Sequence, residues 1–249
     1  MNKKNKKILV LGASSDIGFQ VLNLLNSKGY QIGAHCNTND KILKKYQKNT
    51  KSKFKIFKKK LINQKDSVDL INSFLKWSGN IDVLVHLTGN VSKVSHWTKI
   101  KQSNLIEDFK INFSSTFFVV QKVFNAMKKN KGGKIILAGT SSATHGGGED
   151  SFGYGLSKLN LIYLSKAVAR FGGKYNIICN CVNPGYINTK FHSKVMKRSK
   201  KSLEIRKTKT KLGRSGQPEE IAEFINFLIS DKTDFFTGQN LNIDGGDWI

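Results

Sequence analysis

The chain has 249 residues and a formal net charge of +25, from 42 lysine and arginine residues against 17 aspartate and glutamate residues. This length is enough for one large domain with a substantial core, and the 39% hydrophobic content is that of a globular protein. No apolar run in the sequence reaches the length of a membrane span, and the first residues lack the pattern of a secretory signal. We therefore expect a cytoplasmic protein that does not insert into membranes.

The basic charge suggests a nucleic-acid-binding protein, but the lysines are spread from Lys3 to Lys232 instead of being clustered. We therefore do not expect nucleic-acid binding as the main function, although the charge should attract acidic or phosphorylated ligands at low salt. The three cysteines, Cys36, Cys179 and Cys181, match neither a disulfide framework nor a zinc-binding spacing. We expect them in the core, and the sequence predicts no metal site.

Near the start of the chain, residues 7–12 form a short apolar run that ends in glycine, and residues 16–28 follow with helical spacing. A strand, a glycine turn and a helix in this order aim backbone N–H groups at a phosphate. Asp16 stands where the pattern G-x-x-x-G-x-G has its middle glycine. A carboxylate there can cap the helix, but it would repel a pyrophosphate if it pointed inward. The residues expected at this site are Gly12, Ser14, Ser15, Asp16, Ile17 and Gly18.

The end of the second predicted strand, residues 30–36, bears on the choice of cofactor. In dinucleotide-binding sheets an acidic residue at this point binds the ribose hydroxyls of NAD, whereas a polar or basic environment accommodates the 2′-phosphate of NADP. Here the strand is followed by Asn37, and no acidic residue occurs before Asp40. Together with Ser14, Ser15 and the surrounding lysines, this pattern favours NADP over NAD.

The rest of the chain alternates between predicted strands and helices. The strands are residues 53–57, 81–87, 134–138, 176–182 and 238–243, and the helices are residues 66–77, 105–129, 153–169 and 218–228. This alternation predicts a single α/β domain over residues 1–249, with a doubly wound parallel sheet of about seven strands and helices on both faces. Ligands then bind at the carboxyl ends of the strands. The long polar and basic stretch at about residues 186–212 is expected to form a substrate lid.

Tyr154 and Lys158 are four residues apart on the helix predicted over residues 153–169. On a helix this spacing places the two side chains on one face, about 5–6 Å apart at their Cβ atoms. A neighbouring ammonium favours a phenolate and lowers its pKa from about 10 towards the range where the group exchanges a proton at neutral pH. The same spacing also occurs by chance, and the rest of the chain has to decide between the two interpretations.

With these elements in order, the chain resembles the short-chain dehydrogenase/reductase family from Ile8 to Gly246, and most of all its 3-oxoacyl-acyl-carrier-protein reductases. Five short motifs in the right order carry this resemblance. They are the turn from Gly12 to Gly18, Asn112 in Lys-Ile-Asn-Phe, the Y-x-x-x-K of Tyr154 and Lys158, Asn-Pro-Gly-Tyr-Ile-Asn-Thr from Asn183 to Thr189, and the C-terminal signature between Gly213 and Gly246.

The resemblance implies a Rossmann-type fold and hydride transfer between a nicotinamide and a carbonyl or hydroxyl carbon. It implies that Tyr154 donates a proton to the carbonyl oxygen and that Lys158 lowers the pKa of Tyr154 and hydrogen-bonds the nicotinamide ribose. Ser141, with Thr140 as the alternative, would polarise the carbonyl, and Asn112 would hold a water molecule that links Lys158 to solvent.

The resemblance also extends the expected cofactor site to Thr88, Gly89, Pro184, Gly185, Ile187 and Thr189, together with Tyr154 and Lys158. The family commonly has Asn-Asn-Ala-Gly after the fourth strand, where this chain has His86-Leu87-Thr88-Gly89. Because both amides are missing, we expect cofactor binding there to depend on backbone groups and Thr88. His86 lies within the predicted strand and is expected to be an interior residue.

The substrate implied by the resemblance is a 3-oxoacyl thioester, as in fatty acid biosynthesis, reduced with NADPH. A homotetramer built on the helices of Asn112 and Tyr154 is also implied, as are basic residues for an acidic acyl carrier protein, here Lys128, Lys129, Lys131 and Lys174. One alternative is a family member from a surface-polysaccharide or secondary-metabolite pathway. Another is a non-catalytic homologue that binds a nucleotide or an acidic partner, but the intact Tyr154, Lys158 and Asn112 argue against it.

Overall fold

The computed structural model describes residues 5–26 and 28–247, so residue 27 of the first predicted helix and the outermost positions of the predicted domain lie outside it. The strands are β1 (Lys7–Leu11), β2 (Gln31–Cys36), β3 (Lys53–Lys58), β4 (Val83–His86), β5 (Gly133–Ala138), β6 (Ile177–Pro184) and β7 (Asn240–Ile243). Within the described residues they form one parallel sheet in the order β3-β2-β1-β4-β5-β6-β7, which confirms the predicted doubly wound topology. The strand order reverses between β1 and β4, and this is where such sheets bind ligands.

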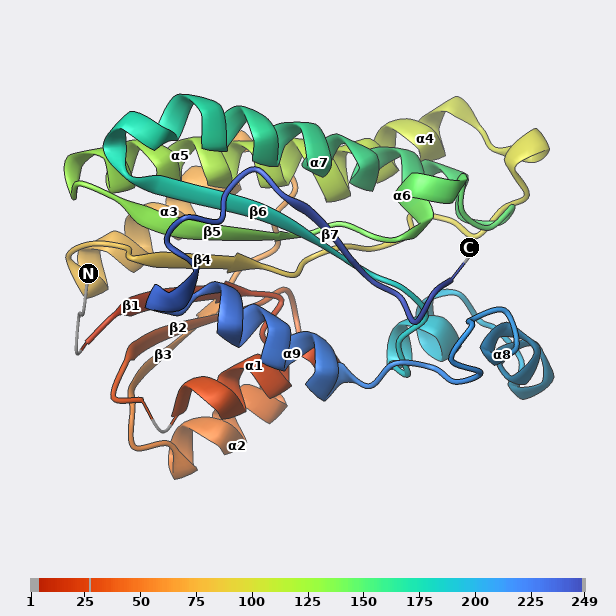
Figure 1. The fold of residues 1–249 in the computed structure, drawn as a ribbon, viewed down its shortest axis with the longest axis horizontal. Coiled ribbons are helices and arrows are strands. Elements are labelled where there is room, and N and C mark those ends of the chain that lie inside the picture. Colours follow the sequence, from red (N-terminus) through yellow and green to blue (C-terminus); the bar gives the residue numbers. More distant parts are fainter. Residues whose placement is uncertain (1–4, 27, 248–249) are drawn as a thin grey trace.

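The long helices cover both faces of the sheet (Figure 1). One face carries α1 (Asp16–Asn26), α2 (Lys41–Asn49) and α9 (Pro218–Leu228), and the other carries α3 (Gln64–Ser78), α5 (Ser115–Lys129) and α7 (Phe152–Gly172). Successive residues of β1 alternate between the two resulting cores: Ile8 and Val10 pack with α1 and α9, while Leu9 and Leu11 pack with α3, α5 and α7. Burial on both sides explains why the strands are nearly continuous apolar runs.

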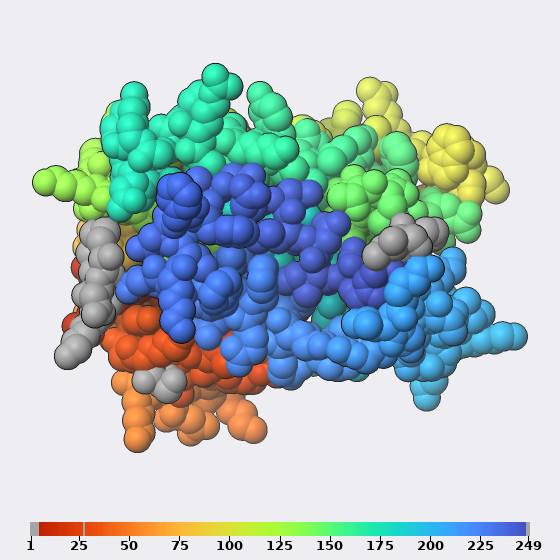
Figure 2. Space-filling view, viewed as in Figure 1, coloured from red at the N-terminus to blue at the C-terminus, as the bar shows by residue number. Residues whose placement is uncertain are grey.

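Shorter elements gather at the carboxyl edge of the sheet. They are α4 (Gln102–Phe109), α6 (Ser142–His145), α8 (Lys200–Lys207) and a π-helical turn over Phe191–Val195. In Figures 1 and 2 the 186–212 segment, with α8, forms a lobe at the right-hand end of the molecule, below the segment of α6. No helix in the described part of the chain is both long enough and apolar enough to cross a membrane.

The predicted helices differ from the observed ones in two informative places. The single helix expected over residues 105–129 begins at Gln102 and is divided into α4 and α5 by a π-helical turn, Lys110–Ser114, where the Ser115 N–H bonds to the Lys110 carbonyl five residues back. Helix α2 was not predicted at all. Only Leu43 and Tyr46 of α2 are buried, so its apolar stripe is too sparse to stand out from the surrounding lysines.

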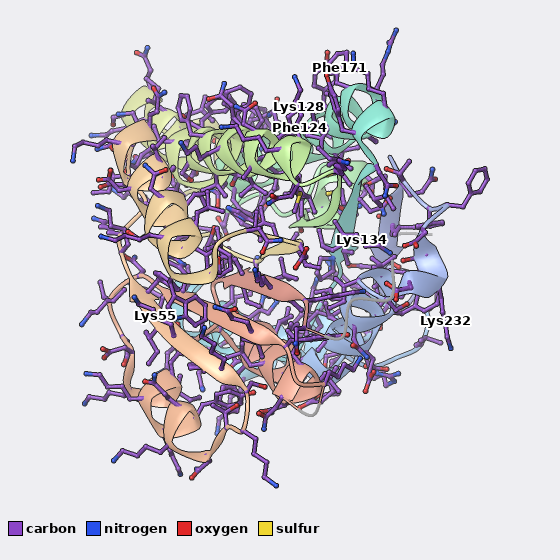
Figure 3. All side chains as sticks on the ribbon, turned by 90° about the vertical axis from the view of Figure 1, so that its left-hand side faces the viewer. Lys55, Phe124, Lys128, Lys134, Phe171 and Lys232 are labelled. Carbon is purple, nitrogen blue, oxygen red and sulfur yellow. The ribbon has the colours of Figure 1, made fainter. Side chains whose placement is uncertain are left out.

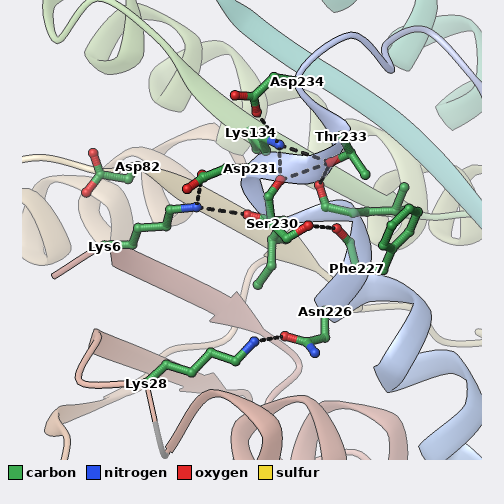
Figure 4. Close-up of polar contacts among 12 residues, drawn as sticks. Lys6, Lys28, Asp82, Lys134, Asn226, Phe227, Ser230, Asp231, Thr233 and Asp234 are labelled. Atoms are coloured by element: carbon green, nitrogen blue, oxygen red, sulfur yellow. Dashed lines mark hydrogen bonds and ion pairs between the residues drawn. The ribbon is translucent and has the colours of Figure 1, made fainter. Parts of the chain in front are cut away.

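At the amino edge of the sheet, two buried lysines fasten the loop after α9 (Figure 4). The Lys6 ammonium lies 2.6 Å from an Asp231 carboxylate oxygen and donates to the Ile229 carbonyl. The Lys134 ammonium, on β5, lies 2.7 Å from an Asp234 oxygen and also donates to Thr233 and to the Ser230 carbonyl. These contacts hold the loop after α9 at the amino edge of the sheet, and so help to keep α9 packed against the sheet.

We expect Lys134→Met to lower the free energy of unfolding by about 2 kcal/mol, because the Ser230 carbonyl loses its charged donor. Urea denaturation followed by circular dichroism measures this change. Lys232→Met, on an exposed lysine of the same loop, is the matched control and should leave the unfolding free energy nearly unchanged. Equal midpoints for the two variants would show that the Lys134 contacts do not stabilise the fold.

Candidate active site

A pocket of about 840 Å³ opens at the carboxyl edge of the sheet, between the start of α1, the ends of β4, β5 and β6, and the 186–212 segment. It brings together most of the residues expected from the sequence. Those that line it are Ser14, Ser15, Asp16, Ile17, Gly89, Ser141, Tyr154, Lys158, Pro184, Gly185, Ile187 and Thr189. The expected residues that do not line it are Gly12, Gly18, Asn37, Thr88 and Asn112.

Gly12 and Gly18 shape the turn between β1 and α1. Gly12 has φ of +77°, and a Cβ there would lie 3.1 Å from the Leu87 carbonyl carbon. A Cβ at Gly18 would lie 2.3 Å from the Gly12 carbonyl oxygen, so only glycine lets the helix start this close to the strand. The Ser15 hydroxyl ties the turn together by donating to the Gly12 carbonyl and accepting from the Gly18 N–H. The turn thus presents the amino end of α1 to the pocket, where an anion binds favourably.

His35, which the sequence analysis did not single out, braces the same turn from β2. Its carbonyl accepts from the Ala13 N–H at 2.9 Å, and its Nδ1 accepts from the Gly12 N–H at 3.3 Å. Its Nε2 lies 2.8 Å from the Lys59 carbonyl. Burial lowers the pKa of His35 to about 4, so the ring is neutral and can accept at one nitrogen while donating at the other.

Asp16 is held by the 186–212 segment, a contact that the sequence did not reveal. One of its carboxylate oxygens accepts from the Lys190 backbone N–H at 2.7 Å, and the other lies 3.1 Å from the Lys190 ammonium. The carboxylate therefore has a cation beside it in the position where the family pattern has glycine. This contact joins the phosphate-facing turn to the start of the 186–212 segment.

Lys158 is buried, and its ammonium is held by two backbone carbonyls. It donates to the carbonyl of Thr88, two residues after β4, at 2.8 Å and to that of Ala138, the last residue of β5, at 2.7 Å. Burial lowers the pKa of Lys158 to about 8. Gly89 is needed beside it, because a Cβ at Gly89 would lie 2.9 Å from the Lys158 Cε.

Asn112 lies behind the pocket wall, in the π-helical turn. Its amide nitrogen donates to the carbonyls of Asn90 and Asp108, and its amide oxygen accepts from the Asn90 N–H. Its backbone carbonyl accepts from the Thr116 hydroxyl. In this structure Asn112 therefore braces the loop whose Thr88 carbonyl holds Lys158, and the π-helical turn gives its side chain the position to do so.

The expected lowering of the Tyr154 pKa is wrong for this state of the protein. Burial raises the pKa of Tyr154 to about 12. The Lys158 ammonium is directed at the carbonyls of Thr88 and Ala138. The Tyr154 ring packs against Phe191, with ring centroids 5.5 Å apart. No described residue hydrogen-bonds the phenol, which leaves a protonated hydroxyl at the pocket wall.

The two candidate hydroxyls beside Tyr154 differ in what they already bind. The Thr140 hydroxyl accepts from the Ser142 N–H at 3.3 Å, at the start of α6. The Ser141 hydroxyl lines the pocket and has no hydrogen-bond partner among the residues described. Ser141 itself is fixed by its backbone N–H, which donates to the Pro184 carbonyl at 3.0 Å. This difference favours Ser141 as the group that meets a ligand.

His86 is an interior residue, as expected. It is fully buried at the end of β4, and burial, followed by the charge of Lys158, lowers its pKa to about 3. The Thr88 hydroxyl lies within 3.4 Å of its ring nitrogens. A histidine that stays neutral and has no access to the pocket does not act as a proton donor there.

These groups fit a dinucleotide and an oxygen-centred proton transfer. The glycine turn and the amino end of α1 form one half of the pocket, and Tyr154, Ser141 and Lys158 form the other. A protonated phenol next to a free hydroxyl can donate two hydrogen bonds to one ligand oxygen, and a buried cation nearby can stabilise the phenolate that forms when the proton leaves.

Comparison with known proteins agrees with this geometry. The family described as enoyl-(acyl carrier protein) reductase matches residues 12–247. The 3-oxoacyl-acyl-carrier-protein reductase FabG of Buchnera aphidicola is 29% identical over 99% of this chain and 98% of its own length, and the 7alpha-hydroxysteroid dehydrogenase of Bacteroides fragilis is 29% identical over 99% and 96%. A short-chain dehydrogenase/reductase from Serratia marcescens superimposes with a TM-score of 0.89 at 26% identity, over 98% of each chain. The chain therefore belongs to the short-chain dehydrogenase/reductase family of NAD(P)-dependent oxidoreductases.

Proposed function

We propose that this protein is an NADPH-dependent carbonyl reductase that acts on a 3-oxoacyl thioester or a similar oxo substrate. The observation that carries the proposal is that the hydroxyls of Tyr154 and Ser141, neither of which has a hydrogen-bond partner among the described residues, line the same pocket as Ser14, Ser15 and Ile17. Lys158 lines this pocket too, as a buried cation. This is the donor set that carbonyl reduction requires.

In this mechanism the bound nicotinamide supplies the hydride, and the chain supplies the proton. The Ser141 hydroxyl positions the substrate carbonyl by donating a hydrogen bond to its oxygen. The Tyr154 phenol, protonated because its pKa is about 12, donates its proton to that oxygen as negative charge develops there. Lys158 stabilises the phenolate left on Tyr154, and Asn112 keeps the loop that holds Lys158 in place.

The cofactor would be held by the residues that line its half of the pocket. Ser14, Ser15 and Ile17, at the amino end of α1, would bind the phosphates, and Gly89 and Thr189 would flank the nicotinamide half. The contact of Asp16 with Lys190 removes the objection that a carboxylate in this turn would repel the pyrophosphate, because an ammonium lies beside it.

The end of β2 supports NADPH over NADH. Asp40, the first acidic residue after the strand, lies 3.1 Å from the Lys44 ammonium and 4.0 Å from the Lys58 ammonium, which holds its pKa below the usual range. Asn37 is exposed at this edge, next to Cys36, which pairs with Lys58 in the sheet. An amide flanked by lysines suits a 2′-phosphate better than a free ribose hydroxyl.

The proposed substrate class, a 3-oxoacyl thioester, is supported by the activities for which the related proteins are named. Besides the FabG reductases, they include acetoacetyl-CoA reductases, a steroid dehydrogenase and an L-rhamnose 1-dehydrogenase that uses NADP. Two of these groups reduce a 3-oxoacyl thioester, which is why we propose that class first. A place in a surface-polysaccharide or secondary-metabolite pathway is the second candidate, supported by the polar and basic 186–212 segment.

The cytoplasmic location expected from the sequence stays a prediction.

The outer face of α4 and α7 supports a homo-oligomer, which we propose to be a tetramer. Large apolar side chains are exposed there without a covering element: Ile106, Phe109, Leu156, Leu159 and Tyr163. Isolated exposed apolar residues are ordinary, but a group of them on adjacent helices marks an interaction surface. A second copy of the chain would cover this face, as the family resemblance implies.

Lys128, one of the basic residues expected to dock an acyl carrier protein, lies near the amino edge of the sheet, on the side that faces the viewer in Figure 3. Lys128 and Lys174 both lie over the ring of Tyr175, at 4.7 and 5.3 Å from its centroid. Helix α7 separates this group from Tyr154, and its 21 residues span about 30 Å. A carrier docked here would therefore serve the pocket of a second copy packed antiparallel along α7, which links the docking proposal to oligomer formation.

The first prediction about the proposed activity concerns pH. We expect kcat/KM for carbonyl reduction to stay constant below about pH 8 and to fall above it, because Lys158, whose pKa is about 8, loses the charge that stabilises the phenolate. NADPH oxidation measured from about pH 6 to about pH 10 tests this profile. Tyr154→Phe should abolish turnover while keeping NADPH binding. A rate that rises through pH 8 would mean that Tyr154 must be deprotonated first, contrary to the proposal.

The second prediction concerns Asp16. Asp16→Asn keeps an acceptor for the Lys190 N–H but removes the negative charge, so the affinity for NADPH should rise about threefold to tenfold at low salt. Lys190→Gln leaves the carboxylate without its cation and should lower the affinity. Calorimetric titration measures both changes, with Glu223→Gln on the exposed side of α9 as the matched control. Weaker NADPH binding by Asp16→Asn would show that the carboxylate contributes to the site.

The third prediction concerns the carrier. Lys129→Glu, on an exposed residue beside Lys128, should raise KM for a carrier-bound 3-oxoacyl substrate about tenfold and leave KM for a small ketone unchanged. Lys48→Glu, which makes the same charge change on α2, is the control and should affect neither. If Lys129→Glu changes the two substrates equally, the basic group does not dock a carrier protein.

A further inference from the structure

The substrate half of the pocket has a wall of rings that leads away from Tyr154 into the 186–212 segment. Tyr154 packs on Phe191, Phe191 on His192 at 5.6 Å, and His192 on Tyr186 at 4.8 Å between ring centroids. All four residues line the pocket. A substrate whose carbonyl meets Tyr154 therefore extends along this wall.

Arg198 is attached to this wall at His192, lines the pocket and reaches towards the loop that carries Gly148. Its backbone N–H donates to the His192 carbonyl at 3.0 Å, which fixes it to the wall. Its guanidinium lies 3.4 Å from the position that a Cβ of Gly148 would occupy, on the loop that leads to Tyr154. Because Gly147 and Gly148 carry no side chains, the guanidinium faces open space between the 186–212 segment and that loop.

The charges around the pocket leave Arg198 without a counterion. Arg206 makes a two-pronged ion pair with the buried Asp247, Lys190 is paired with Asp16, and Glu149 lies 3.4 Å from His96. No carboxylate lies within ion-pair distance of Arg198 among the described residues, although it is only partly exposed to solvent.

The neighbouring groups do not supply the missing negative charge. His192 stays neutral, since burial together with the charges of Arg198 and Arg206 lowers its pKa to about 4. Asp150 also lines the pocket but makes no ion pair with Arg198. A partly buried guanidinium is stabilised when an anion joins it through charge-assisted hydrogen bonds, and its planar fork matches carboxylate and phosphate oxygens.

We propose that Arg198 is a specificity residue that binds a carboxylate or phosphate group carried by the substrate, so that the pocket selects anionic oxo compounds. This inference rests on the proposed reductase activity and specifies its substrate. The anion is either part of the small oxo compound itself or belongs to the carrier of a thioester. Arg198 holds this group while the carbonyl lies against Tyr154 and Ser141.

The test compares pairs of substrates that share the reducible oxo group, one member of each pair being anionic and the other neutral. The first pair is 4-oxopentanoate and its methyl ester, and the second is acetoacetyl-CoA and the neutral acetoacetyl-N-acetylcysteamine. In Arg198→Gln we expect kcat/KM to fall at least tenfold for the anionic member of a pair and to change little for the neutral member. A loss confined to the first pair assigns the anion to the oxo compound, and a loss confined to the second assigns it to the carrier phosphates.

Three controls separate this role from others. Arg198→Lys should recover part of the selectivity because it keeps the charge, and Lys200→Gln, on the exposed start of α8, should leave it unchanged. The affinity for NADPH should be the same in Arg198→Gln as in the wild type. An equal loss for anionic and neutral substrates, or a loss of NADPH binding in Arg198→Gln, would overturn the assignment.

The outcome also distinguishes this inference from the proposed function. If the wild type binds NADPH but reduces none of the four compounds, the proposed reductase activity fails. Calorimetric titration of the NADP-bound protein with 4-oxopentanoate and with acetoacetyl-CoA then tests Arg198 directly. Binding of either anion that Arg198→Gln weakens at least tenfold supports the anion site, and unchanged or absent binding overturns it.

Discussion

The buried ammonium of Lys158 is the constraint on which the site depends. Removing a charge from water is costly, and here the cost is offset by the carbonyls of Thr88 and Ala138. Thr88 follows β4 and Ala138 ends β5, and in these paired strands His86 lies opposite Leu137, so strand pairing sets the geometry of the cation site. Gly89 is then required, because any side chain there would collide with the lysine.

The loop that supplies the Thr88 carbonyl is held from behind by α4 and the π-helical turn. The Asn112 side chain hydrogen-bonds both the N–H and the carbonyl of Asn90. The Asp108 carboxylate accepts from the Ser92 N–H at 2.6 Å. The other Asp108 oxygen lies 2.4 Å from where a Cβ of Gly153 would be, so this carboxylate also meets the first turn of α7. Asn112 in the π-helical turn and Asp108 at the end of α4 thus together fix the loop and the start of the helix that carries Tyr154.

The sequence predicted what depends on local pattern and missed what depends on contacts between distant segments. The doubly wound parallel sheet, the glycine turn and the placing of Tyr154 and Lys158 on one helix follow from apolar periodicity and motif spacing, and the structure agrees with them. Asn112 in the π-helical turn contacts Asn90, 22 residues away, and the raised pKa of Tyr154 comes from its burial among distant parts of the chain. Neither can be read from spacing along the chain.

The contact between Asp16 and Lys190 shows why the total charge of +25 is a poor guide to the pocket. Exposed lysines more than about 8–10 Å away are screened at physiological salt, so the pocket responds mainly to the charges on its own walls. Along the 186–212 segment these walls pair Lys190 with Asp16 at one end and Arg206 with Asp247 at the other. Arg198 lies between the two pairs and faces the substrate half, so the local arrangement, and not the excess of lysine, determines which ligand charge the site accepts.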